Sequence, residues 1–302
     1  MRTVDKKGNH MLISSARSHP PVSGRSVSGR LRAVCAAGAT AVLLLTGAAA
    51  PAASTPSDPA RADEAMAWQT LIDGGSFQSR AALESEWNYL YPWGSDHNGT
   101  ARMYASSTDS NHLYLSPAGQ LNIKASPISW DEGNSNKDPF LPIEYHSAAI
   151  HAKDQIVVNN TYPDYEIRGE FQAPSARGTW PAFWITGANS WPPESDILEF
   201  KGDARNWFNT YDGSWDNTIV PVSSPGSWHE YRIWMTKVNA TDVEIHYYLD
   251  DVWKASHIGS NFVGKPMNLI INLQMEGSSG TPGPSGDTYF RARDVYVGRT
   301  AN

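Results

Sequence analysis

The stretch Trp191-Pro192-Pro193-Glu194-Ser195-Asp196-Ile197-Leu198-Glu199-Phe200 places three acidic side chains at spacings of two and three residues. In a regular β-strand alternate side chains share a face, so Glu194 and Asp196 point one way and Glu199 points the other way. One extra residue between Asp196 and Glu199, a β-bulge, would bring all three carboxylates to one side. The apolar residues of the stretch could still reach a core behind them. The stretch therefore predicts a bulged strand with an acidic face.

Strand-like alternation continues on both sides of this stretch. Alternating segments are separated by clusters of Gly, Pro, Asn and Asp, and a helical pattern is confined to Arg80–Glu86. The clearest strand segments are Leu113–Leu115, Gln120–Ala125, Ser147–Ala152, Tyr165–Gln172, Thr179–Ile185, Asp196–Phe200, Trp228–Thr236, Val243–Leu249, Met267–Met275 and Thr288–Val297. With no internal repeat, the pattern predicts one all-β domain over residues 66–302, an antiparallel sandwich or jelly roll.

Three carboxylates in a row suit the hydrolysis of glycosidic bonds. The retaining form of this reaction needs two carboxyl groups about 5–5.5 Å apart, one as nucleophile and one as general acid and then base. A third acid between them can share a proton or a hydrogen bond and move the pKa values of the other two apart. The alternative interpretation is an acidic strand face that is exposed to solvent.

The faces of other strands favour a carbohydrate cleft. Trp180 and Trp184 share a strand face and would form a stacking platform for the C–H faces of sugar rings, although a strand tryptophan is more often a core residue. Polar and apolar side chains alternate in Ile271–Glu276 and again in Tyr165–Phe171. Several strands with one polar and one apolar face are expected if a concave sheet forms the cleft.

The charge of the chain is divided unevenly. Residues 1–53 hold seven Lys or Arg and one acid, so residues 54–302 keep 17 bases against 30 acids, a net charge of −13. A phosphate-binding surface needs clustered Lys and Arg. This balance argues against nucleic acid or an anionic membrane as the partner and favours a neutral polysaccharide.

The first 53 residues are typical of a secretion signal. Basic residues precede the apolar run Ala33–Gly47, and small residues after it offer cleavage sites. The alternative, a membrane anchor, would need a run of roughly 20 residues. Residues 54–65 are expected to be a linker or a ragged mature terminus. We therefore expect a secreted, extracellular protein without a thiol, because Cys35, the only cysteine, would leave with the signal.

Together these motifs resemble glycoside hydrolase family 16 in its bulged-strand form. The resemblance rests on Glu194-x-Asp196-x-x-Glu199, on the strand around Trp180 and on the segment Tyr165–Phe171, and it covers most of residues 68–302. It implies a β-jelly roll of two curved antiparallel sheets, with the substrate cleft across the concave sheet. It also implies that Glu194 is the nucleophile, Glu199 the acid/base and Asp196 the assisting carboxylate.

The resemblance implies no cofactor for the chemistry. Asp294 matches a position that supplies a structural calcium ligand in many members of the family, and the alternative is an ordinary aspartate near a strand end. The residues that we expect to bind substrate are Trp180, Trp184, Arg168, Asn209, Tyr211, Asp212, Trp215, Gln274 and Glu276.

Departures from the family pattern limit the prediction of the substrate. Pro193 precedes Glu194, and Ser195 replaces an aliphatic residue, so the core behind this strand must pack differently. Asn209–Gly213 stands where many glucanases have a His-containing stretch. We expect β-1,3- or β-1,3/1,4-glucan as the leading substrate, with a β-galactan, agar-type or β-1,3-linked, close behind.

Three functions are compatible with these residues. The first is an endo-acting, retaining β-glycanase that works as a monomer on a polysaccharide. The second is a non-catalytic carbohydrate-binding domain on the same fold, which would have no reason to keep an acid/base pair. The third is a transglycosylase, which forms the same covalent intermediate and differs only in whether a sugar or water accepts it.

Overall fold

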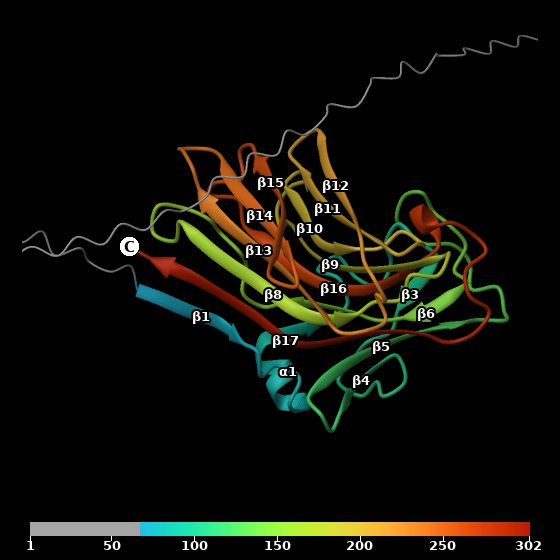
Figure 1. The fold of residues 1–302 in the computed structure, drawn as a ribbon. Helices are drawn as coiled ribbons and strands as arrows, with labels where there is room; N and C mark the ends of the chain where they lie inside the picture. The colour runs from blue at the N-terminus through green and yellow to red at the C-terminus, as the bar shows by residue number, and fades with distance from the viewer. Residues whose placement is uncertain (1–66) are drawn as a thin grey trace, which may run out of the picture. The chain divides into compact units, whose positions relative to one another are not determined.

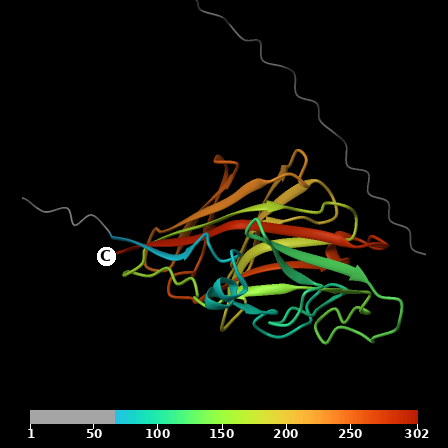
Figure 2. The ribbon, with the colours of Figure 1, turned by 90° about the horizontal axis from the view of Figure 1, so that it is seen from below.

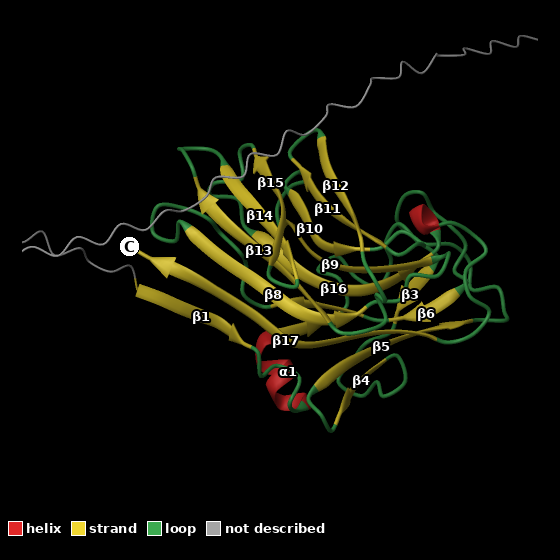
Figure 3. Ribbon diagram, in the orientation of Figure 1, coloured by secondary structure: helices red, strands yellow, loops and turns green. Residues whose placement is uncertain are grey.

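Two β-sheets form the described part of the chain, residues 67–302, in the computed structural model (Figure 1). The predicted secretion signal, residues 1–53, and the predicted linker, residues 54–65, lie outside the described residues. Strands dominate these residues, and helical structure is limited to α1 (Arg80–Glu86) and one 3₁₀ turn, η1 (Gly277–Ser279), as Figure 3 shows. The predicted all-β fold is therefore confirmed.

The smaller sheet has seven strands in the order β12-β11-β10-β9-β16-β7-β2. Their bounds are β2 Trp87–Tyr89, β7 Ala149–Ala152, β9 Thr179–Gly187, β10 Glu194–Glu199, β11 Arg205–Tyr211, β12 Trp215–Pro221 and β16 Met267–Met275. All of its strand pairs are antiparallel.

The larger sheet has ten strands in the order β15-β14-β13-β8-β17-β5-β6-β3, with β1 beside β17 and β4 beside β5. Their bounds are β1 Ala67–Asp73, β3 Ala101–Met103, β4 Leu113–Ser116, β5 Gln120–Pro127, β6 Tyr145–Ser147, β8 Asp164–Gln172, β13 His229–Lys237, β14 Val243–Leu249, β15 Val252–Gly259 and β17 Thr288–Ala301. Figure 2 shows β1 lying along β17, so the start and the end of the described part pair with each other.

The core lies between the two sheets and follows from the alternation in the sequence. Ile167 and Phe171 of β8 and Phe183 of β9 are fully buried, and the rings of Phe171 and Phe183 are 4.8 Å apart across the interface. Each sheet therefore turns one apolar face inward and leaves its other face free. The face of the smaller sheet that points away from the core carries the candidate site.

The predicted bulge is confirmed. Asp196 of β10 lies opposite Trp184 of β9, but Leu198 lies opposite Phe183, so Ile197 is the extra residue.

The helical pattern at Arg80–Glu86 forms α1. Its N-cap is Ser79, whose hydroxyl accepts a hydrogen bond from a backbone N–H of the first turn at 3.0 Å.

Candidate active site

A cleft of about 530 Å³ lies over the smaller sheet. Side chains of β9, β10 and β16, three neighbouring strands, form much of its lining. Glu194, Asp196 and Glu199 all line the cleft, because the bulge at Ile197 turns Glu199 to the same side as the other two. The structure therefore brings the three predicted carboxylates together.

Asn209 of β11 holds two of these carboxylates. Its amide group donates hydrogen bonds to Oδ2 of Asp196 at 2.7 Å and to Oε2 of Glu199 at 2.6 Å. The side-chain oxygen Oδ1 of Asn209 accepts a hydrogen bond from the amide of Asn217 of β12 at 2.8 Å, which fixes the orientation of the Asn209 amide. Asn209 is fully buried, so it positions the carboxylates and does not offer the open substrate contact that the sequence predicted.

The two glutamates have different partners. The indole N–H of Trp180 donates to Glu199 at 2.7 Å, and the ammonium of Lys201 lies 3.1 Å from the same carboxylate. Glu194 accepts a hydrogen bond from the indole N–H of Trp191 at 3.0 Å. A charged donor favours the ionised form of a carboxylate more than a neutral donor does. The site is therefore electrostatically unequal, because Glu199 has a cation within ion-pair distance and Glu194 is held by a neutral indole.

Burial and mutual repulsion raise the pKa values of the other two carboxyl groups. Burial raises the pKa of Glu194 to about 7, and the charge of Glu199 adds to this effect. Burial, followed by the charges of Glu199 and Glu194, raises the pKa of Asp196 well above its ordinary value. Both shifts have the same sign, so burial and mutual repulsion favour a protonated form of these two carboxyl groups.

Comparison with known proteins places the chain among glycanases. It is 45% identical to a galactan endo-β-1,3-galactanase of Flammulina velutipes, over 77% of this chain and 91% of that protein. It is 26% identical to an endo-1,3-1,4-β-glycanase of Rhizobium meliloti, over 73% of this chain but only 49% of that protein. A solved non-specific endo-β-1,3(4)-glucanase from glycoside hydrolase family 16 shares the fold, with a TM-score of 0.52 at 16% identity over 78% of this chain and 91% of that one. No protein-family model matches the sequence.

The chain belongs to glycoside hydrolase family 16. It is an endo-acting β-glycanase, and the chemistry of this family needs no cofactor. This result favours the enzyme over the binding-only alternative.

No helix among residues 67–302 of the family 16 enzyme is long and apolar enough to cross a membrane.

Trp180 and Trp184 lie on the cleft face of β9 as predicted, but they do not form an open platform. Their side chains are only 8% and 6% exposed, and the indole N–H of Trp184 donates to Asn272 at 2.8 Å. They form the floor of the cleft and hold polar groups in place. The exposed indoles at the cleft are Trp191, at 57%, and Trp215, at 49%.

Trp191 was not among the predicted substrate-binding residues. It lies in the loop before β10 and stacks on Tyr211 of β11 at a centroid distance of 4.3 Å. Tyr211 in turn contacts Trp215 of β12 at 4.6 Å, so the predicted Tyr211 supports the two exposed indoles. The signal for Trp191 was present, because it opens the stretch that carries the carboxylates, but alternation along a strand cannot place a loop residue.

The prediction that Arg168 binds substrate is wrong. Arg168 lies on β8 in the larger sheet, where its guanidinium packs over the ring of Tyr296 at 4.7 Å and lies 3.5 Å from Glu230. The alternate residues Ile167 and Phe171 point into the core, so the polar face of β8 points to the opposite side of the molecule from the cleft.

Two further predicted substrate contacts have structural roles instead. The carboxylate of Glu276 accepts hydrogen bonds from the Thr281 hydroxyl at 2.9 Å and from the backbone N–H of Gly283 at 2.7 Å, so it closes the loop after η1. Asp212 accepts hydrogen bonds from the backbone N–H groups of Ser214 and Ser260, both at 3.2 Å, and lies outside the cleft lining. Both carboxylates stabilise turns at strand ends.

Gln274 lines the cleft as predicted, but its polar atoms are occupied. Its side-chain oxygen accepts a hydrogen bond from the backbone N–H of Ala101 at 2.7 Å, and its amide donates to the carbonyl of the same residue at 3.1 Å. Gln274 therefore clamps β3 against β16.

Asp294, the predicted calcium ligand, is exposed on β17. Its carboxylate lies 3.6 Å from the guanidinium of Arg293. Within residues 67–302 no group of three His, Cys, Asp or Glu side chains could hold a metal ion. The calcium ligand stays a prediction.

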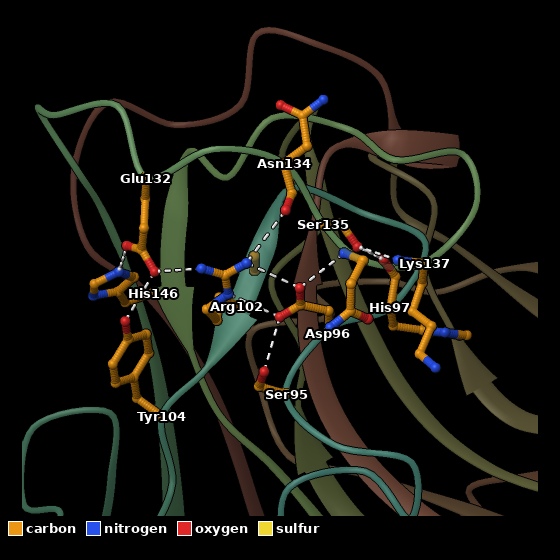
Figure 4. A network of polar contacts seen from close by, with 12 residues as sticks. Ser95, Asp96, His97, Arg102, Tyr104, Glu132, Asn134, Ser135, Lys137 and His146 are labelled. Carbon is orange, nitrogen blue, oxygen red and sulfur yellow. Dashed lines mark hydrogen bonds and ion pairs between the residues drawn. The ribbon is translucent and has the colours of Figure 1, made fainter.

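A second wall of the cleft comes from loops that the sequence did not point to. Arg102 bridges Asp96, at 2.8 and 2.9 Å, and Glu132, at 2.8 Å, as Figure 4 shows. This bridge holds the loop that carries Lys137 beside His97, and both residues line the cleft. Burial, together with the charge of Lys137, lowers the pKa of His97 to about 4, so the imidazole is neutral at neutral pH.

Proposed function

We propose that this family 16 glycanase cleaves internal bonds of β-1,3-galactan with retention of anomeric configuration. The observation that carries the mechanism is the bulge at Ile197, which puts Glu194, Asp196 and Glu199 on one face of one strand within the cleft. The choice of galactan is supported by the 45% identical relative that is named as a galactan endo-β-1,3-galactanase.

In the first step Glu194 attacks the anomeric carbon while Glu199 protonates the departing glycosidic oxygen. The glycosidic bond breaks, and a covalent bond forms between the sugar and Glu194. The ammonium of Lys201, 3.1 Å from Glu199, stabilises the carboxylate that remains after the proton has left. Asp196 lies between the two glutamates along the strand, and its raised pKa lets it share a proton with either neighbour.

In the second step Glu199 acts as base and removes a proton from water, which attacks the anomeric carbon and releases Glu194. Two inversions give overall retention. Proton NMR during the first minutes of a digest should show the β-anomer before mutarotation. An α-anomer as the first product would mean direct displacement by water and would contradict the assignment of Glu194 as nucleophile.

β-1,3- or β-1,3/1,4-glucan is the second candidate substrate, since the Rhizobium meliloti relative is named an endo-1,3-1,4-β-glycanase. The two candidates separate on a panel of β-1,3-galactan, β-1,3-glucan, mixed-linkage glucan and agarose, with product sizes followed over time. We expect β-1,3-galactan to be shortened from within, with the highest kcat/KM. Faster cleavage of either glucan would reject galactan as the main substrate. Products longer than the starting chains would show that sugar acceptors compete with water.

We also propose that the enzyme is exported and acts as an extracellular monomer. The support is the basic and then apolar sequence of residues 1–53, followed by small residues. Terminal sequencing of the protein from culture medium should find a start between residues 48 and 66, and size-exclusion chromatography should give a mass of one chain. An intact first residue on protein retained inside the cell would contradict export.

A further inference from the structure

A chain of hydrogen-bonded polar groups crosses the apolar layer directly behind the three carboxylates. Ser195 of β10, Thr210 of β11 and Tyr247 of β14 are all buried, and Tyr247 comes from the opposite sheet. The Tyr247 hydroxyl lies 2.7 Å from the Ser195 hydroxyl and 2.6 Å from the Thr210 hydroxyl, and it donates to the carbonyl of Asn209 at 2.8 Å. Ser195 is the residue that replaces the aliphatic side chain of the family pattern.

The chain continues to His257 of β15. Nδ1 of His257 lies 3.1 Å from the Thr210 hydroxyl, and Nε2 lies 3.0 Å from the Thr218 hydroxyl. Burial lowers the pKa of His257, although the charge of Asp216 acts in the opposite direction, so the imidazole carries one proton.

Counting the available protons fixes which group donates and which accepts in each of these hydrogen bonds. Because Tyr247 donates to the Asn209 carbonyl, its oxygen must accept the protons of Ser195 and Thr210. Thr210 must then accept from Nδ1–H of His257, and Nε2 must accept from Thr218. Every donor is used once, which is the condition for burying such groups without a large penalty.

Tyr247 contacts both β10, which carries the carboxylates, and β11, which carries Asn209. Ser195 lies between Glu194 and Asp196, whose side chains point to the cleft, and Asn209 donates to Asp196 and Glu199. The ladder between β10 and β11 covers only three residue pairs, from Glu194 to Asp196, and beyond the bulge the Asn206 side chain connects the strands. A hydrogen bond is directional, whereas an apolar contact tolerates sliding. The Tyr247 hydroxyl bonds both members of the central pair, Ser195 and Thr210, so it is placed to fix the two strands relative to each other within this short ladder.

We propose that Tyr247 is a positioning residue for this active site: its hydroxyl, through Ser195 and the Asn209 backbone, holds the carboxylate-bearing β10 and the Asn209-bearing β11 in their reactive arrangement. This inference rests on the proposed function. It assigns no contact with substrate to Tyr247, so loss of the hydroxyl should change turnover and leave substrate binding unchanged.

The test compares Tyr247→Phe with Tyr231→Phe. Tyr231 is an equally buried tyrosine of the larger sheet, and its hydroxyl has no hydrogen-bond partner within residues 67–302. We expect Tyr247→Phe to lower kcat on β-1,3-galactan about ten- to hundredfold with KM within twofold, because small displacements of reacting groups are costly. The alkaline limb of its pH–rate profile should also move to higher pH, because a displaced Asn209 amide stabilises the ionised form of the two carboxyl groups that it contacts less, so the proton for acid catalysis is kept to higher pH. Tyr231→Phe should leave kcat, KM and the profile unchanged.

A double variant separates positioning from stability. Ser195→Ala with Tyr247→Phe removes two of the polar groups without adding volume, a change that is often close to neutral for folding. We expect a melting temperature close to that of the wild type together with the lowered kcat. A kcat loss no greater than that of Tyr231→Phe would overturn the proposal. If the proposed function itself were wrong, Glu194→Gln would keep its turnover, which is a separate result.

Discussion

β10 and β8 both carry charged side chains that alternate with apolar ones, but they present these charges to different surroundings. On β10, in the cleft, Asp196 and Glu199 are buried and are held by neutral or cationic donors at 2.6–3.1 Å. On β8, Glu166 and Arg168 are partly exposed and pair with each other at 3.8 Å. Of these two strands, β10 is the one on which like charges are buried together. Buried like charges cost free energy, and a chain keeps them where their chemistry is used.

The largest effect should come from the carboxylates themselves. Glu194→Gln and Glu199→Gln should each lower kcat on β-1,3-galactan by about a thousandfold or more, because each keeps its shape but loses its charge or its proton. The matched change on the other sheet, Glu166→Gln, should leave kcat within twofold. Comparable losses in all three variants would remove the distinction between the two strands. Turnover close to wild type in Glu194→Gln would reject the nucleophile.

The sequence could predict the β10 side of this comparison because the spacing of two and then three residues is unusual in a strand. It could not assign β8 to a sheet. Each sheet turns one apolar face inward, so alternation in Tyr165–Phe171 looks the same whether the other face meets a cleft or solvent. Only the pairing of β8 with β13 and β17 places Arg168 away from the cleft.

Contacts that depend on register or on loops were also beyond sequence reasoning. Asn209 reaches Asp196 because β11 pairs with β10 in one particular register. Trp191 reaches Glu194 from a loop. β12 was not predicted. Trp215–Pro221 is an edge strand whose side chains are mostly exposed on both faces, so its sequence lacks the apolar residues at every second position that mark a strand packed on a core.

The second prediction concerns pH and distinguishes the buried carboxyl groups of β10 from the partly exposed Glu166 of β8. Only ionised Glu194 can attack, and its pKa is raised to about 7, so kcat/KM should fall about tenfold per pH unit below that value. Stability should change in the opposite sense. A carboxyl group whose folded pKa exceeds its unfolded value stabilises the fold fully at low pH, and this contribution is lost as pH rises from about 4.5 to 7.

Melting temperatures at pH 5 and pH 8 provide the check. Glu194→Gln cannot ionise at this position, so its melting temperature should fall less between the two pH values than that of the wild type. Glu166→Gln should follow the wild type. Equal pH dependence in all three proteins would show that Glu194 titrates as an ordinary exposed carboxyl group.

The third prediction compares two indoles of equal exposure. Trp191 at the cleft and Trp253 on β15 are both 57% exposed, and each donates one hydrogen bond, to Glu194 and to Ser256 respectively. Trp191→Ala should raise KM for galactan oligosaccharides about tenfold, because a sugar ring loses its stacking surface. Trp253→Ala should leave KM within twofold. Equal effects would mean that exposure alone, without position in the cleft, determines binding.

The smallest effect should come from Arg168. Its ion pairs, at 3.5 and 3.8 Å, lie on a partly exposed surface, and such pairs contribute about 0–1 kcal/mol. It also lies directly opposite Arg232 on β13, an unfavourable pairing of like charges. Arg168→Gln should therefore change the free energy of unfolding by less than about 1 kcal/mol and leave kcat/KM within twofold. Because Arg168 was expected in the cleft from sequence alone, this variant tests the sheet assignment directly. A fivefold loss of kcat/KM with unchanged stability would mean that substrate reaches the face of β8, and that the cleft is not confined to the smaller sheet.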